Sequence, residues 1–137
     1  MTELELIALA KEARTHAYIP YSGYAVGAAL LTKDGKVYQG CNIENASFGP
    51  TNCAERTAFF TAVYQGERQF EAIAVVGGKA GEEVSDFFPP CGVCRQVMRE
   101  FCQDDFKVIM GGKDDEYKVM TLAEILPASF SPSDLSK

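Results

Sequence analysis

Residues 70–77, FEAIAVVG, have a continuous apolar centre, which is typical of a strand that is buried on both faces of a sheet. A helical segment at 91–102 follows, and a second apolar segment, 106–110, comes after it. A strand, a helix and a strand in this order predict a parallel pair of strands joined by a right-handed crossover. The sequence therefore predicts an α/β fold built around this unit.

The flanking segments extend the predicted sheet on both sides. Before the central unit, the apolar segments 25–32 and 36–43 are joined by Asp34-Gly35, a turn pair typical of β-hairpins. After the central unit, residues 116–120 form a short strand. The predicted sheet is therefore mixed and has five strands.

Further helices are predicted around this sheet. A capping box, T-x-x-E, opens a segment with helical apolar spacing over 3–17. A second helix is expected over 53–66, and a short one follows another capping box at 121–124. Helices on both faces make the sheet the middle layer of a three-layer α/β/α sandwich. We expect a single domain over residues 1–137, since this length suits one core.

The composition narrows the possible partners and compartments. The net charge of −6 argues against a nucleic-acid polymer, because phosphate backbones are bound by clustered Lys and Arg. No apolar run approaches the ~20 residues that a membrane span needs, and the N-terminus lacks the basic region of a signal peptide. Five cysteines do not form the even set of a secreted disulfide framework. We therefore expect a cytoplasmic protein with a small-molecule substrate.

Three cysteines and one glutamate form the most informative chemical pattern. Cys53 and Glu55 lie two apart in CAE, and Cys91 and Cys94 lie three apart in PCGVC. Because side chains in the first turn of a helix lean back toward its N-terminus, sulfur atoms from two helix starts can reach one ion. Thiolates suit Zn²⁺, and three protein ligands are typical of a catalytic site in which water is the fourth. Glu55 can carry protons to and from that water.

Two other interpretations of the cysteines stay open. Cys91 and Cys94 alone would also fit a redox-active Cys-x-x-Cys pair, although such a pair needs no third cysteine. Cys41 as a fourth ligand would give a closed, noncatalytic zinc-binding module. We expect Cys41 instead to be a small buried residue. Cys102 lies about 12 Å beyond Cys94 along the same helix and is too far away to be a ligand.

The charge of such a site needs compensation, because three thiolates on Zn²⁺ are net negative and oppose ionisation of a bound water. Each helix N-terminus contributes roughly 0.3–1 kcal/mol per favourable contact. Arg56, three residues after Cys53, is expected to lie against a thiolate and balance its charge. Arg95, four residues after Cys91, is a weaker candidate for the same role. His16, the single histidine, is expected at the surface or an interface and not as a ligand.

Several segments together match those of a known family. They are Tyr21-Ser22, VGAAL at 26–30, GCNIEN at 40–45, CAERTA at 53–58 and PCGVCRQ at 90–96. With these segments the chain resembles the small, homotetrameric, zinc-dependent cytidine deaminases over nearly its whole length. The cysteine and glutamate motifs are those of zinc deaminases in general. The NIEN segment is more specific to enzymes that act on free nucleosides.

The resemblance implies hydrolytic deamination of cytidine and 2′-deoxycytidine to uridine and 2′-deoxyuridine, with release of ammonia, as in pyrimidine salvage. It implies that zinc-bound hydroxide attacks C4 while Glu55 shuttles protons to N3 and to the departing amine. It also implies that the backbone N–H of Ala54 orients the pyrimidine. Asn42 and Glu44 would hold the ribose hydroxyls. Ile43 between them is expected to pack inward and to contribute its backbone.

Three aromatic residues complete the resemblance. Tyr24 stands where the family often has a Phe near the base, and Phe48 stands where Tyr is common at the subunit border. Phe130 resembles the aromatic residue that a neighbouring subunit lends to the active site of a homotetramer. The alternative is a tail residue folded onto its own core. An alternative substrate is a related aminopyrimidine nucleoside such as blasticidin S, which the segment 42–44 disfavours.

Overall fold

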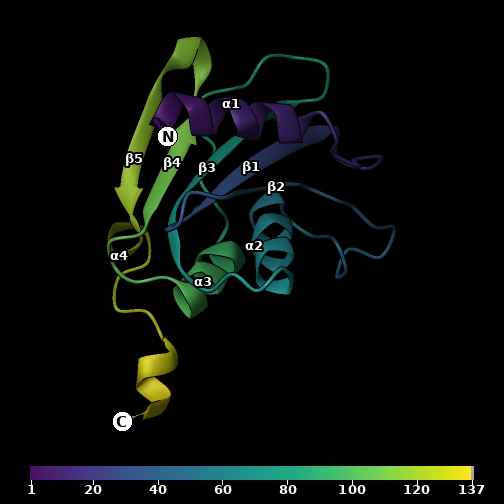
Figure 1. Ribbon diagram of the computed structural model, residues 1–137. Helices are drawn as coiled ribbons and strands as arrows, with labels where there is room; N and C mark the ends of the chain where they lie inside the picture. Colours follow the sequence, from purple (N-terminus) through teal and green to yellow (C-terminus); the bar gives the residue numbers. More distant parts are fainter. Residues whose placement is uncertain (137) are drawn as a thin grey trace.

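In the computed structural model, which describes residues 1–136, a mixed five-stranded sheet has the order β2-β1-β3-β4-β5 (Figure 1). The strands are β1 (Tyr24–Thr32), β2 (Val37–Cys41), β3 (Phe70–Lys79), β4 (Lys107–Gly111) and β5 (Tyr117–Thr121). β3 and β4 pair in parallel, and the other neighbouring strands pair antiparallel. The predicted mixed sheet, with its hairpin and its parallel pair, is confirmed.

Helices cover both faces of this sheet. The helices are α1 (Glu3–Arg14), α2 (Ala54–Tyr64), α3 (Gly92–Phe101) and α4 (Leu122–Ile125), with the 3₁₀ helices η1 (Lys113–Asp115) and η2 (Pro132–Ser136). α1 lies on one face, and α2 and α3 lie on the other (Figure 1). Both predicted capping boxes are present, at the starts of α1 and α4. The predicted three-layer α/β/α sandwich is confirmed.

β3 is buried on both faces, as its apolar sequence predicts. Ile73 and Val75 pack with α2 and α3. Ala72, Ala74 and Val76 point the other way and pack with α1. Complete burial of a Val or Ile side chain contributes about 1.5–3 kcal/mol, so the central strand anchors the layers on both sides.

Two element ends differ from the prediction for a tertiary reason. α1 ends at Arg14, short of residue 17, and β2 ends at Cys41 instead of 43. Beyond these ends the two chain segments meet, because the N–H of Tyr18 donates to the carbonyl of Asn42 at 3.0 Å. The N–H of Glu44 donates to the carbonyl of Tyr18 at 2.9 Å. Residues 15–17 form a tightened turn with hydrogen bonds to the carbonyls three residues back, and pairing with the segment after β2 begins at Tyr18.

Gly40 lets α2 pack directly on β2. A Cβ at this position would lie 2.4 Å from the carbonyl oxygen of Ala54 and 2.5 Å from the backbone nitrogen of Ala58. Both are backbone atoms of α2, so a side chain at residue 40 would force the helix away from the sheet. Gly40 thus fixes the helix that carries Cys53 and Glu55.

Gly40→Ala is expected to lower the free energy of unfolding by about 1–3 kcal/mol, because overpacking forces backbone shifts of this cost. Denaturant unfolding followed by circular dichroism measures the change. Gly49→Ala is the control, since a Cβ at Gly49 would have no heavy atom within 4 Å. Equal unfolding midpoints for the two variants would show that α2 does not depend on this close approach.

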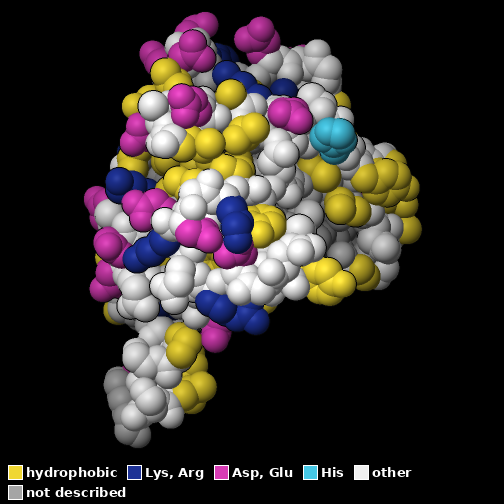
Figure 2. Space-filling view, in the orientation of Figure 1, with side chains coloured by type: hydrophobic (Ala, Val, Ile, Leu, Met, Phe, Trp, Pro, Cys, Tyr) yellow, Lys and Arg dark blue, Asp and Glu magenta, His cyan; other side chains and the backbone are white. Residues whose placement is uncertain are grey.

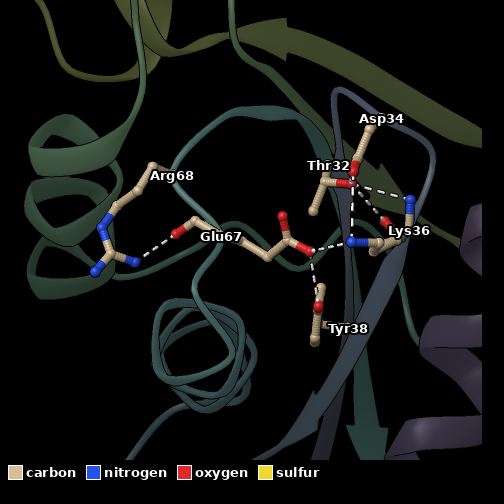
Figure 3. Close-up of polar contacts among 6 residues, drawn as sticks. All are labelled: Thr32, Asp34, Lys36, Tyr38, Glu67 and Arg68. Carbon is tan, nitrogen blue, oxygen red and sulfur yellow. Dashed lines mark hydrogen bonds and ion pairs between the residues drawn. The ribbon is translucent and has the colours of Figure 1, made fainter.

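A polar network fixes the other end of α2 (Figure 3). The Glu67 carboxylate, on the segment that follows α2, accepts from the Tyr38 hydroxyl at 2.7 Å and pairs with Lys36 at 3.4 Å. Lys36 also pairs with Asp34 at 3.5 Å in the β1–β2 hairpin. The network ties the C-terminal end of α2 to β2, while Gly40 seats its N-terminal half. The helix is therefore held at both ends against the same strand.

The surface carries mixed charges and the single histidine. Figure 2 shows Lys and Arg side chains interspersed with Asp and Glu over the visible face. His16, the cyan side chain in that view, is exposed, as predicted. Among residues 1–136, no helix combines the length and the apolar character that crossing a membrane requires.

Candidate active site

Three cysteine sulfurs converge at the starts of α2 and α3. Cys53 is the N-cap of α2, Cys91 is the N-cap of α3, and Cys94 lies in the first turn of α3. The Sγ atoms all lie within 4.8 Å of one another, and those of Cys53 and Cys91 are 3.8 Å apart. The prediction that two helix starts aim their sulfurs at one point is confirmed.

The backbone at both N-caps explains this convergence. Cys53 has φ −76° and ψ 157°, and Cys91 has φ −69° and ψ 166°, which are extended conformations typical of N-caps. Neither cysteine makes the side-chain capping hydrogen bond. Their sulfurs can therefore point to a common centre that lies in front of two helix N-termini, where negative charge is favoured.

Proton sharing among the sulfurs indicates that a cation fits here. The pKa of Cys53 is lowered to about 5, first by a hydrogen bond from Cys94 and also by one from Arg56. The pKa of Cys94 is raised, because its thiol donates to Cys53 and is buried. Three thiolates this close repel one another strongly. A divalent ion that prefers sulfur removes the repulsion, and Zn²⁺ satisfies both requirements.

Arg56 lies where the sequence predicted it. Its Nη2 atom is 3.3 Å from the Sγ of Cys53, so its charge faces the sulfur cluster. Its Nε atom is buried and, among the residues that the structure describes, has no hydrogen-bond partner. An unsatisfied buried nitrogen costs stability. The guanidinium therefore keeps this position through its attraction to the sulfurs.

The prediction that Arg95 balances the charge of a thiolate is wrong. Its Nε atom donates to the carbonyl of Pro90 at 2.8 Å, and its Nη1 atom donates to the carbonyl of Ile125 at 2.8 Å. The guanidinium faces carbonyl groups and not the thiolate of Cys91. The i+4 spacing placed Arg95 on the correct helix, but these tertiary acceptors attract it elsewhere.

Glu55 is a buried carboxyl in the first turn of α2. It is 4% exposed, and the preceding Ala54 is completely buried. Burial is the main reason why the pKa of Glu55 is raised to about 7. A carboxyl with this pKa can both accept and release a proton near neutral pH. The structure thus places an acid–base group two residues from the ligand Cys53.

No fourth ligand joins the cluster within residues 1–136. The three cysteines form a group without a further His, Cys, Asp or Glu atom at ligand distance. Cys41 is partly buried, and burial raises the pKa of its thiol. Cys102 is buried in the core and lies outside the sulfur cluster, in agreement with the prediction that it is not a ligand. A set of three protein ligands is typical of catalytic zinc sites.

Asn42 is oriented by neighbouring backbone. Its Oδ1 atom accepts from the N–H of Val26, and its Nδ2 atom donates to the carbonyl of Tyr24, each at 2.9 Å. The second N–H of the amide remains as a donor for a ligand. Asn42 is therefore fixed against the start of β1.

The Glu44 carboxylate closes the loop before β1. Its Oε1 atom accepts from the N–H groups of Tyr21 at 3.0 Å and Ser22 at 3.1 Å. Hydrogen bonding, in which the Ser22 side chain contributes most, holds the pKa of Glu44 below its ordinary value. Both of these backbone hydrogen bonds fall on Oε1, so Oε2 can accept from a hydroxyl. The carboxylate is therefore ionised at neutral pH and fixed in direction.

Ile43 does not pack inward, so that expectation is wrong. Its side chain is 44% exposed. Its backbone is occupied by Asn52: the N–H of Ile43 donates to the carbonyl of Asn52 at 3.0 Å, and the N–H of Asn52 donates back at 2.9 Å. Asn52 directly precedes Cys53, so this pair links the segment 42–44 to the metal ligands. No sequence pattern pointed to Asn52, because the pairing is not local.

The predicted aromatic residues lie at the surface. Tyr24 begins β1 and is 44% exposed, and Phe48 is 86% exposed. Phe130 is 60% exposed, so the alternative in which it folds onto its own core is wrong. Phe59 is buried in the core, whereas Tyr64 on the same helix is exposed. These exposed rings are available to a second chain.

Comparison with known proteins agrees with this geometry. A family model, the cytidine and deoxycytidylate deaminase zinc-binding region, matches residues 1–110. The chain is 50% identical over 132 residues to the cytidine deaminase of Sporosarcina psychrophila, covering 96% of this chain and 93% of that protein. It is 42% identical over 134 residues to the probable cytidine deaminase of Dictyostelium discoideum, covering 97% and 87%.

Solved structures give the same result. The fold matches the crystal structure of cytidine deaminase from Burkholderia pseudomallei with a TM-score of 0.87 and 48% identity, covering 95% of this chain and 100% of that one. It matches the crystal structure of cytidine deaminase from Mycobacterium tuberculosis with a TM-score of 0.78 and 36% identity, covering 92% and 94%. The family match includes both cysteine motifs and the segment 42–44.

Proposed function

The chain belongs to the cytidine and deoxycytidylate deaminase zinc-binding family, and we propose that it hydrolyses cytidine and 2′-deoxycytidine to uridine and 2′-deoxyuridine with release of ammonia. The observation that carries this proposal is the meeting of three sulfurs within 4.8 Å at two helix N-termini, beside the buried carboxyl of Glu55. It combines a site for a Lewis-acid metal with an acid–base group, which is what hydrolytic deamination requires.

Glu55 performs the proton transfers. Zinc held by Cys53, Cys91 and Cys94 supplies Lewis acidity, which lowers the pKa of a water to near neutrality. Glu55 takes up the two protons of the attacking water one after the other, delivering the first to N3 of the pyrimidine and the second to the amine that leaves C4. Its pKa of about 7 suits both directions of transfer. The atoms balance as cytidine plus water giving uridine plus ammonia.

Four other residues orient the substrate in this proposal. The backbone N–H of Ala54, at the start of α2, contacts the pyrimidine. The remaining N–H of Asn42 and the Oε2 atom of Glu44 bind the ribose hydroxyls. Tyr24, whose carbonyl fixes Asn42, borders the sugar and base. Arg56 offsets the negative charge of the thiolates.

We further propose a homotetramer in which Phe130 of one subunit completes the active site of the next. The exposed rings of Tyr64, Phe48 and Phe130, each at least 60% exposed in the single chain, support this assembly. Burial of these rings by a neighbouring subunit would be favourable, because apolar area would be removed from water. Light scattering that gives a monomer mass would contradict it. We also propose a location in the reducing cytosol, because the cysteines that hold zinc must stay out of disulfides, and the structure shows all five without one.

The zinc-loaded protein is expected to turn over cytidine with kcat/KM about 100-fold or more above that for free cytosine. Free cytosine lacks the ribose, so the contacts of Asn42 and Glu44 are lost, and hydrogen bonds to charged groups contribute about 1.5–3 kcal/mol each. Loss of the cytidine absorbance band, with ammonia measured in parallel, gives both rates.

Glu44→Gln is the variant that separates binding from chemistry in this comparison. It is expected to narrow the preference for cytidine over cytosine, because the amide keeps the shape but loses the charge. Equal kcat/KM values for cytosine and cytidine would contradict the proposal that Asn42 and Glu44 bind the ribose. A protein that holds one zinc per chain but turns over neither compound would refute the proposed function.

A further inference from the structure

The segment 126–130, which connects α4 to the C-terminal 3₁₀ helix, has an unusual backbone. Ala128 has φ 50°, a left-handed conformation that residues other than glycine seldom adopt. Such a conformation persists only where the surrounding structure fixes it, and it concentrates at functional positions. The surroundings of Ala128 therefore indicate what the segment does.

Core packing fixes this segment at its start, where Leu126 packs against the core, but residues 127–130 are exposed or half-buried. A cavity of about 710 Å³ lies between the C-terminal end of α3 and the residues of this segment. Its lining includes Arg99, Pro127, Ala128 and Ser129. Figure 1 shows the chain leaving the body of the molecule after α4 and running to η2, which lies apart from the sheet. Polar contacts must therefore hold the segment beyond Leu126.

Three side chains of α3 supply those contacts, and we name them the α3 clamp: Arg95, Gln96 and Arg99. Arg95 holds the start of the segment through its 2.8 Å bond to the carbonyl of Ile125. Gln96 donates from Nε2 to the carbonyl of Phe130 at 2.9 Å. Arg99 donates from Nε to the Ser129 hydroxyl at 2.8 Å. The clamp thus grips the segment on both sides of Ala128.

The clamp is rigidly joined to the metal ligands. Arg99 is 9% exposed, and its Nη1 atom pairs with Asp104 at 2.9 Å, which fixes the direction of its guanidinium. Arg95 also donates to the carbonyl of Pro90, the residue before Cys91. α3 itself begins directly after its N-cap Cys91 and carries Cys94. The position of Phe130 is therefore set from the same helix that holds two zinc ligands.

We propose that Gln96 and Arg99 are positioning residues for Phe130: the α3 clamp fixes where this ring stands, so that it can complete the substrate site of a second copy of the chain. The inference rests on the proposed function, in which Phe130 reaches that site. The clamp holds the backbone at Ser129 and Phe130 and leaves the ring 60% exposed. It acts on substrate binding and not on proton transfer.

Gln96→Ala is expected to raise KM for cytidine about three- to tenfold, the factor given by one net hydrogen bond, with little change in kcat or zinc content. Gln39→Ala is the matched control. Gln39 is also exposed, and its Nε2 atom donates to a backbone carbonyl, that of Leu9, at 2.8 Å. Gln39→Ala should lower the stability of the protein by a similar amount and leave KM for cytidine unchanged. Ser129→Ala, which removes the acceptor of Arg99, should raise KM as Gln96→Ala does.

A double variant distinguishes positioning from general loosening. If Gln96 acts through Phe130, then Gln96→Ala combined with Phe130→Ala should be no worse than Phe130→Ala alone. The clamp would be overturned if the KM increases of the two single variants multiplied in the double variant. It would also be overturned if Gln96→Ala and Gln39→Ala had the same KM.

Wild-type turnover reports separately on the proposed function. If the zinc-loaded wild type did not turn over cytidine, that function would be refuted, and the clamp would be judged by amide hydrogen exchange over 128–131. Gln96→Ala should accelerate this exchange and Gln39→Ala should not. Equal exchange in the two variants would overturn the clamp.

Discussion

Glu55→Gln is expected to lower kcat for cytidine by about 10²–10⁴-fold, the range that positioned acid–base groups contribute. Glutamine has nearly the same shape and fits the buried position, where Glu55 is 4% exposed. It cannot take a proton from water or return one to the departing amine. Because the sulfur ligands are untouched, zinc content should stay at one ion per chain. Steady-state kinetics and metal analysis on the same preparation measure both quantities.

Glu71→Gln is the control for this substitution. Glu71 lies exposed on β3, so the same change of charge there should leave kcat within about twofold of wild type. If Glu55→Gln kept full zinc and full kcat, Glu55 would not be the proton carrier. If it lost zinc as well as activity, its role would be structural. The two measurements together therefore separate chemistry from metal binding.

Local physics made the metal site predictable from the sequence. Cys53, Cys91 and Cys94 could be predicted to share one ion because each stands at a helix start, and a side chain in the first turn points toward the helix N-terminus. The same holds for the core strand 70–77, whose unbroken apolar run requires cover on both faces. The role of Glu55 was predicted from its position two residues after Cys53. Within each element, these features depend on local spacing.

The features that were missed depend on contacts between elements. Arg95 has the spacing to reach a thiolate, but carbonyl acceptors on other segments hold it. Ile43 was expected inside because it is apolar, yet its backbone pairs with Asn52 and its side chain stays exposed. The conformation of Ala128 is equally invisible in the sequence, since alanine carries no signal for positive φ. Only the assembled structure supplies these partners.

Removal of zinc is expected to abolish turnover and to lower the free energy of unfolding. The loss is about 4 kcal/mol relative to a solution in which the free zinc concentration is about 1,000 times the dissociation constant. The ion binds the folded site, so its binding free energy adds to folding. Without it, the sulfurs of Cys53 and Cys94 share protons, and Cys94 is held as the thiol. Dialysis against a chelator, thermal unfolding and readdition of zinc measure the loss and its reversal.

Cys94→Ser should reproduce the metal-free state, whereas Cys41→Ala should keep one zinc per chain, because Cys41 lies outside the sulfur cluster. Cobalt substitution reports the ligand set directly, since charge-transfer absorption scales with the number of thiolate ligands. Three sulfurs in wild type and in Cys41→Ala would agree with the site. Four sulfurs in wild type and three in Cys41→Ala would make Cys41 a ligand and the centre a closed one.

The chelation experiment has its own contradicting outcome. A chelated protein that still deaminates cytidine at the wild-type rate would show that the cluster of Cys53, Cys91 and Cys94 serves folding alone, because nothing else among residues 1–136 gathers three such ligands.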